Sequence, residues 1–150
     1  MAFSSILFLL FIGAPISVLI HEFGHAIAAS CVNAKHITIY LGSGRDLFAF
    51  RLGRLKLVVR LFYFVGGLTT NERSIHYSKR ELLWITSFGS VLNGFVAIIL
   101  FFLMMWVPNV YLSIMFWFNL WLAIGNLLPI RINDKKTDGY TILEIFKRTG

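Results

Sequence analysis

The chain has 150 residues, of which 57% are hydrophobic and 14% are charged, and its formal net charge is +7. A soluble domain carries about 25% charged residues, so this composition predicts a membrane protein of a single domain. The basic residues are typical of cytoplasmic loops and not of nucleic-acid binding, because no polar segment alternates aromatic with basic residues. The single cysteine, Cys31, excludes an internal disulfide and a zinc site made of thiolates, and it is expected to be buried.

The first predicted element is a membrane helix over about residues 3–30. The segment from Ala2 to Ile20 carries no charge, and at about 1.5 Å per residue it matches the thickness of the hydrocarbon core. Gly13 and Pro15 interrupt this run and predict a kink. Asn33 is expected to end the element.

The end of this helix carries the sequence His21-Glu22-Phe23-Gly24-His25. Two histidines four residues apart lie on one face of a helix, where their imidazoles can bind a single Zn²⁺. In zinc hydrolases with this pattern, the glutamate accepts the proton of the attacking water. The alternative interpretation is a local ion pair near a helix end. It is weakened by the apolar run before the motif, since ionisable groups there cost free energy unless they have a function.

A β region is predicted over residues 36–67. Three stretches rich in β-branched and aromatic residues, 36–41, 47–52 and 55–64, indicate a small antiparallel sheet that Gly66-Gly67 closes. His36 and His76 lie in or near this region. We expect both to be surface residues and not metal ligands.

The second predicted membrane helix covers about residues 81–107. Gly89, Asn93 and Ala97 follow one another at intervals of four and form a single stripe on it. The stripe predicts a seam where helices pack closely. A second interpretation adds Asn93 as a hydrogen-bonding group beside the metal site, and the two interpretations are compatible.

The third predicted membrane helix covers about residues 110–129 and ends with Asn126-Leu127-Leu128-Pro129. The tail, residues 130–150, is polar and closes with a short amphipathic segment. The predicted fold is thus a mainly α, polytopic membrane protein. Three transmembrane helices form its core, a small antiparallel sheet joins helices 1 and 2, and residues 1–150 make one domain.

The distribution of charge predicts the orientation in the membrane. Nine Lys and Arg residues lie between Lys35 and Arg80, and the other five follow Pro129. Because positive loops stay inside, the β region and the C-terminus are expected in the cytoplasm and the N-terminus outside. The histidine motif then lies toward the cytoplasmic side.

A catalytic zinc site takes three protein ligands and keeps one open position, so one ligand remains to be found. Asp138, followed by the flexible Gly139, lies just beyond the third helix, where the chain returns to the membrane face. Asp134 is its nearest competitor, and Glu81 at the start of the second helix is a more distant one.

These motifs together resemble the site-2 protease family of intramembrane zinc metalloproteases, including its sporulation-type bacterial members. The resemblance is carried by the H-E-x-x-H motif at His21, by the N-x-x-P segment at Asn126 and by Asp138-Gly139. The stretch from Gly89 to Asn93 is similar to a small-residue motif of the family, although Ser90 stands where proline is common. The resemblance covers the whole chain as a minimal three-helix core.

The chain departs from the family pattern at the third ligand. The family's aspartate lies about four residues nearer to the N-x-x-P segment, which corresponds to Asp134 here, but Lys135 follows it in place of glycine. The resemblance favours Asp138 because it keeps the Asp-Gly pair. This choice implies a loop insertion between Arg131 and Lys136.

The resemblance implies a zinc-dependent endopeptidase in which His21, His25 and Asp138 hold Zn²⁺ and Glu22 is the catalytic base. Asn93 and Asn126 would bind the substrate or stabilise the oxyanion. The implied substrate is a single-span membrane protein or a membrane-associated peptide precursor, which is cleaved in or next to its transmembrane segment. The implied location is the lipid bilayer of a bacterial cell membrane. A regulatory membrane partner is a further expectation.

The alternative is a non-catalytic binding or regulatory protein that retains the scaffold. Such a protein has no need of Glu22. A metal-ion carrier is disfavoured because no charged residue lies between Leu82 and Leu128.

Overall fold

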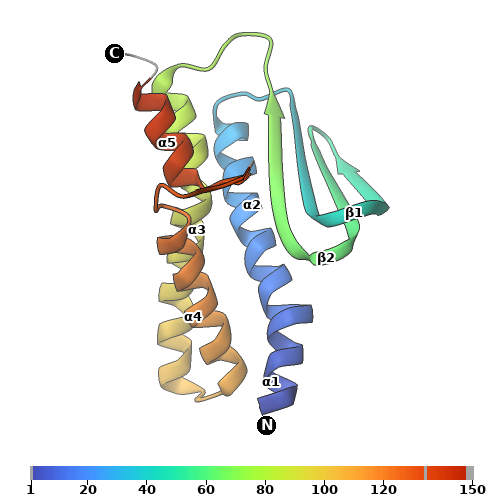
Figure 1. Cartoon of the computed structure of the whole chain (residues 1–150), viewed down its shortest axis with the longest axis vertical. Helices are drawn as coiled ribbons and strands as arrows, with labels where there is room; N and C mark the ends of the chain where they lie inside the picture. The colour runs from blue at the N-terminus through green and yellow to red at the C-terminus, as the bar shows by residue number, and fades with distance from the viewer. Residues whose placement is uncertain (1, 134, 148–150) are drawn as a thin grey trace.

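A computed structural model describes residues 2–133 and 135–147. As expected, it is mainly helical with a small antiparallel two-stranded sheet between the first two long helices (Figure 1). The elements follow one another as α1 (Ala2–Phe8), η1 (Leu9–Gly13), α2 (Ala14–Cys31), β1 (His36–Leu52), β2 (Leu55–Glu72), α3 (Lys79–Trp106), α4 (Val110–Gly125), β3 (Arg131–Ile132), β4 (Lys135–Lys136) and α5 (Asp138–Lys147).

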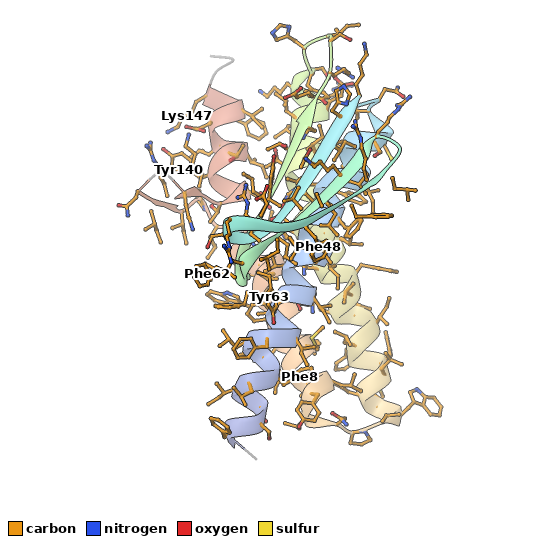
Figure 2. The ribbon with its side chains drawn as sticks, turned by 90° about the vertical axis from the view of Figure 1, so that its right-hand side faces the viewer. Phe8, Phe48, Phe62, Tyr63, Tyr140 and Lys147 are labelled. Carbon is orange, nitrogen blue, oxygen red and sulfur yellow. The ribbon has the colours of Figure 1, made fainter. Side chains whose placement is uncertain are left out.

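The N-terminal helix is continuous from α1 to α2, but a π-helical turn, η1, interrupts its α-helical geometry just where a kink was predicted. Pro15 causes the irregularity because it has no N–H to donate to the preceding turn. The hydroxyl of Tyr63 instead donates to the carbonyl of Phe11 at 3.4 Å, and Figure 2 shows Tyr63 beside this helix. Asn33, with φ of 61°, follows the helix end as expected. The prediction that Cys31 is buried was wrong, because the last turn packs through Ala28 and Ala29 and leaves Cys31 exposed.

The sheet is a long, bent hairpin. β1 and β2 are antiparallel, and their ends meet with Thr38 opposite Thr70 and Leu52 opposite Leu55. The start of β1, residues 37–41, has neighbours on both sides: residues 67–71 at the end of β2 on one side and residues 55–59 at the start of β2 on the other. The hairpin therefore folds back on itself. Contrary to the prediction, Gly66-Gly67 does not end the sheet. The segment from Leu68 to Glu72 continues β2 because it pairs with the start of β1.

One face of the sheet packs on α2. Ile37 and Ile39 are fully buried against Ala26, Ala28 and Ala29, and Ile85 of α3 completes this cluster. The small alanine side chains let the sheet lie close to the helix, which brings the last strand of the hairpin beside the histidine motif.

The long helix α3 begins at a capping box, in which the Ser78 side chain accepts from the N–H of Glu81 and the Glu81 carboxylate accepts from the N–H of Ser78. It crosses α2 at two glycines. A Cβ on Gly24 would lie 2.6 Å from the carbonyl oxygen of Phe88, and a Cβ on Gly89 would lie 2.5 Å from Nε2 of His25. Gly89, Asn93 and Ala97 are all buried, which confirms the predicted packing seam.

The segment α4 ends at Gly125, four residues before its predicted end, because residues 126–128 form a turn whose first carbonyl, that of Asn126, accepts from Gly139. The chain then makes the short β3–β4 hairpin, drawn in red near the centre of Figure 1, and enters α5.

Two helical segments of the described chain, Phe3–Cys31 and Lys79–Trp106, are long and apolar enough to cross a membrane. In the most apolar window of each segment only a small share is buried, 17% in Phe3–Cys31 and 22% in Lys79–Trp106. These helices are therefore not the enclosed core helices of a soluble domain. In Figure 2 many of their side chains project outward. The helix α4 is apolar but shorter, with 16 residues.

Candidate metal centre

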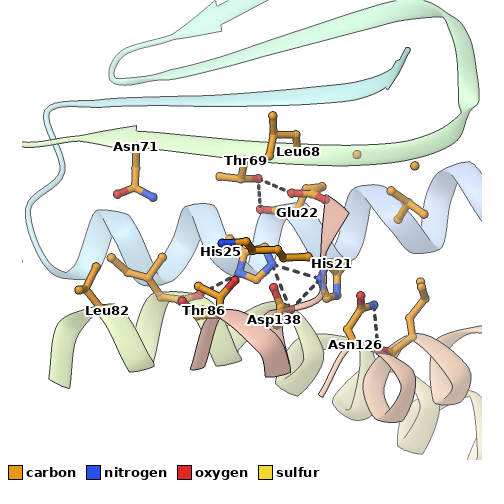
Figure 3. Close-up of a pocket in the computed structure, with 17 residues that line it drawn as sticks. His21, Glu22, His25, Leu68, Thr69, Asn71, Leu82, Thr86, Asn126 and Asp138 are labelled. Carbon is orange, nitrogen blue, oxygen red and sulfur yellow. Dashed lines mark hydrogen bonds and ion pairs between the residues drawn. The ribbon is translucent and has the colours of Figure 1, made fainter. Parts of the chain in front are cut away.

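The structure brings together the three residues that the sequence favoured as ligands. Nε2 of His21 lies 3.1 Å from Oδ2 of Asp138 and 3.1 Å from Nε2 of His25, and Nε2 of His25 lies 3.5 Å from Oδ2 of Asp138. A metal ion in a protein is commonly held by His, Cys, Asp or Glu side chains. Within the described part of the chain, His21, His25 and Asp138 are the group of such residues whose ligand atoms lie close enough together to share one ion (Figure 3).

The spacing of these three atoms fits a tetrahedral zinc ion. Ligand atoms at about 2.0–2.2 Å from such an ion lie about 3.3–3.6 Å from one another. The observed separations of 3.1 to 3.5 Å are close to this range. Two imidazoles and one carboxylate are also a ligand set that zinc commonly takes, and it leaves a fourth position open for water or substrate.

Both histidines are oriented by a bond to the other ring nitrogen. Nδ1 of His25 lies 2.8 Å from the backbone carbonyl of Ile85, and Nδ1 of His21 lies 2.9 Å from Oδ1 of Asn93. Both partners accept, so each Nδ1 carries the proton and each Nε2 presents a lone pair. Three atoms with lone pairs at such short separations repel one another unless a positive charge lies between them, which supports a cation site.

Asp138 is placed by the start of α5. It is the first residue of that helix, and the Thr137 hydroxyl oxygen before it accepts from the N–H of Tyr140 at 3.3 Å, as an N-cap does. Gly139 packs directly on the backbone of Leu127, where a Cβ would overlap the carbonyl oxygen, and its N–H donates to the Asn126 carbonyl at 2.8 Å. The Asp-Gly pair thus docks the start of α5 on the turn that follows α4 and directs Asp138 at the histidines.

Glu22 lines the same pocket from the sheet side of the histidines. Its side chain is buried, and its Oε2 accepts from the hydroxyl of Thr69 on β2 at 2.7 Å. The pocket has a volume of about 480 Å³. The lining consists in part of His21, His25 and Asp138, of Glu22, and of the Gly66–Thr69 segment of β2.

The two asparagines singled out in the sequence have different positions. Asn126 lines the pocket, and its Nδ2 donates to the carbonyl of Leu122 at 3.0 Å. Asn93 is fully buried behind His21, and both hydrogens of its amide group are donated, to Ser17 and Asn119. This placement favours a supporting role for Asn93 over the predicted contact with substrate.

Among the alternatives, Asp134 lies outside the described residues. Glu81 forms an ion pair with Arg73 at 2.8 Å and is not part of the three-residue cluster. His36 and His76 are exposed, in agreement with the prediction that they are surface residues.

Sequence reasoning missed three residues that support the site. Thr69 orients Glu22, and the Ser90 hydroxyl lies 3.5 Å from the Asp138 carboxylate. Asn119 bonds to Asn93. The last of these carried a usable signal, because an amide side chain in the middle of the apolar segment Val110–Gly125 costs free energy unless it has a partner.

A comparison with known protein families matches residues 7–110 to peptidase family M50, a stretch that includes the H-E-x-x-H motif and Asn93 but ends before Asp138. A comparison with curated proteins gave no match. The matched stretch is more than half of the chain, and the structure adds a convergent His-His-Asp group to it. The chain therefore belongs to peptidase family M50, the site-2 protease family.

Proposed function

We propose that this protein is a zinc-dependent intramembrane endopeptidase. It hydrolyses a peptide bond in or next to the transmembrane segment of a membrane-anchored protein or peptide precursor. The observation that carries this proposal is the meeting of His21, His25 and Asp138 around one point in the pocket that Glu22 also lines. The family membership supports metalloprotease chemistry.

When bound, zinc supplies a Lewis acid that polarises the scissile carbonyl and makes water acidic enough to lose a proton near neutral pH. Glu22 accepts that proton and returns it to the leaving amine. The hydrogen bond from Thr69 orients the Glu22 carboxylate for both transfers. Asn126, on the pocket wall, holds the substrate backbone beside the reacting carbonyl. Glu22 and the Thr69 hydroxyl that orients it are both in place. A purely regulatory protein has no need of this pair, so its presence favours an enzyme.

We propose that the substrate binds as an extended strand along β2. The segment from Leu68 to Asn71 pairs with β1 on one side, and Leu68, Thr69 and Asn71 line the pocket. Among the described residues no second strand pairs with its pocket side. A helical transmembrane substrate must unwind before its amides become accessible, and an edge strand supplies the hydrogen bonds that the unwound backbone has lost.

The proposed topology has three membrane spans in a bacterial cell membrane, with the N-terminus outside and the sheet and C-terminus in the cytoplasm. The helix α4 has 16 residues, about 24 Å at 1.5 Å per residue. The turn after it carries the apolar residues Leu127 and Leu128, so the apolar segment, though not the helix, continues toward the thickness of the hydrocarbon core. The basic residues of β1, β2 and the tail favour this orientation.

The direct test compares the unmutated chain with Glu22→Gln, which keeps the size of the side chain and removes its basicity. Each would be co-expressed with a library of tagged single-span membrane proteins, and the purified chains analysed for metal. We expect about one zinc per chain in both forms, and cleaved products with the unmutated form alone. Cleavage that persists in Glu22→Gln would exclude the proposed base, and a chain without zinc would exclude the proposed class of enzyme.

A further inference from the structure

Three polar side chains lie between the helices behind His21 and outside the pocket. Ser17 on α2, Asn93 on α3 and Asn119 on α4 each have an exposed fraction of 0%. Buried polar groups in apolar surroundings must be hydrogen-bonded, so the bonds they make determine how each amide group is turned.

The amide of Asn119 has only one orientation that satisfies its neighbours. Its Nδ2 lies 2.8 Å from the backbone carbonyl of Met115 and 2.9 Å from the hydroxyl oxygen of Ser17. A carbonyl only accepts hydrogen bonds, so the nitrogen of the amide, not its oxygen, must face Met115. Oδ1 of Asn119 is therefore turned toward Asn93.

Asn119 and the backbone carbonyl of Ser17 together fix the orientation of Asn93. Nδ2 of Asn93 lies 2.8 Å from Oδ1 of Asn119 and 3.1 Å from the backbone carbonyl of Ser17, and both of these atoms accept. Its two amide hydrogens are thus used, and Oδ1 faces Nδ1 of His21 at 2.9 Å. Because Oδ1 cannot donate, Nδ1 of His21 must carry the proton.

We infer that Asn119 is a positioning residue for His21. Acting through Asn93, it fixes the imidazole with its proton on Nδ1 and directs the lone pair of Nε2 at the point shared with His25 and Asp138. The inference rests on the proposed metal site. His25 needs no such side chains, because the backbone carbonyl of Ile85 holds its Nδ1.

The network also connects all three long helices to one ligand. Asn119 belongs to α4, so the packing of α4 is coupled to the orientation of a metal-binding group on α2. Partners in this position affect metal affinity by about 10- to 100-fold in other metalloproteins. Removing Asn119 takes away the shorter of the two acceptors of the Asn93 amide and leaves only the Ser17 carbonyl, at 3.1 Å, to orient it. The amide then turns more readily. A turned amide presents an N–H to His21 and favours the tautomer that cannot bind the metal through Nε2.

The test compares Asn119→Leu with Ser17→Ala in the full-length chain purified in detergent. Ser17→Ala removes a hydroxyl from the same network but keeps both backbone carbonyls that orient the amides, so it controls for a merely structural role. Zinc affinity would be measured by competition with a chelator. We expect the zinc Kd to rise about tenfold or more in Asn119→Leu and by less than about twofold in Ser17→Ala.

A second readout is ¹⁵N NMR of histidine-labelled, zinc-loaded protein. The Nδ1–H signal of His21, assigned by its change in Asn93→Leu, should shift and exchange faster in Asn119→Leu, while that of His25 stays in place. If Asn119→Leu folds poorly, Asn119→Ser, which is too short to reach Asn93, gives the same comparison with less change in packing.

Equal losses of affinity in Asn119→Leu and Ser17→Ala, or an unchanged His21 signal, would overturn the inference and leave the proposed function intact. An unmutated chain that binds no zinc would overturn both.

Discussion

Replacing Gly139 by alanine should disrupt the proposed metal centre, although Gly139 is not one of the proposed ligands. The new Cβ would overlap the carbonyl oxygen of Leu127 and lie 2.8 Å from the carbonyl carbon of Leu128, which is 0.6 Å inside the 3.4 Å where ordinary contact begins. Both obstacles are backbone atoms and cannot rotate away. The start of α5 must therefore move outward, and Asp138, the preceding residue, moves with it.

The expected loss of metal affinity follows from the size of this movement. Bonds between zinc and its ligands vary by only about 0.2 Å, so a displacement of more than half an ångström removes Asp138 from the first shell. Loss of an orienting partner alone costs about 10- to 100-fold in affinity, and loss of a ligand should cost at least about 100-fold. Chelator competition on the purified protein would measure the change.

The matched control is Gly94→Ala. The nearest atom to a Cβ at this position is Cβ of Ala123 at 3.7 Å, which is ordinary contact, and alanine favours a helix interior. We expect this variant to bind zinc as the unmutated chain does. A Gly139→Ala protein that binds zinc equally tightly would refute the argument that the Asp-Gly pair positions the third ligand.

Three further predictions concern the pocket. Gly89→Ala would place a Cβ 2.5 Å from Nε2 of His25, the proposed ligand atom, so zinc affinity should fall about tenfold or more in the same competition assay. Thr69→Val removes the donor to Glu22 and should slow hydrolysis about tenfold or more at unchanged zinc content, whereas Thr69→Ser should keep most of the rate. Leu68→Pro, on the pocket edge of the sheet, should slow cleavage without releasing zinc. Phe50→Pro, on the far edge, should leave the rate of cleavage unchanged. Equal rates of cleavage in the two variants would argue against strand addition.

The parts of the site that were predictable from the sequence depend on local geometry. His21 and His25 share a face in any helix, and the stripe from Gly89 to Ala97 reports close helix packing by its spacing alone. The Asp138-Gly139 pair was predictable from its motif. Its physical basis, the contact of Gly139 with Leu127, becomes visible once α5 is placed against the turn that follows α4.

The parts that were not predictable depend on which distant segments meet. The extension of β2 to Glu72 comes from pairing with His36, and the early end of α4 comes from the bond between Asn126 and Gly139. In the sequence Asn119 is the single amide side chain of an apolar run, and its partner Asn93 is visible only in the structure. Spacing within a helix says nothing about such partners on other helices.

In the proposed site, two imidazoles and the carboxylate of Asp138 hold one zinc ion. The most direct measurement is X-ray absorption at the zinc edge of the loaded chain, compared with Asp138→Ala and Asp134→Ala. We predict a first shell of two imidazole nitrogens and protein oxygen at about 2.0–2.2 Å, unchanged in Asp134→Ala and missing the carboxylate in Asp138→Ala. A first shell that stays intact in Asp138→Ala would rule out Asp138 as the third ligand.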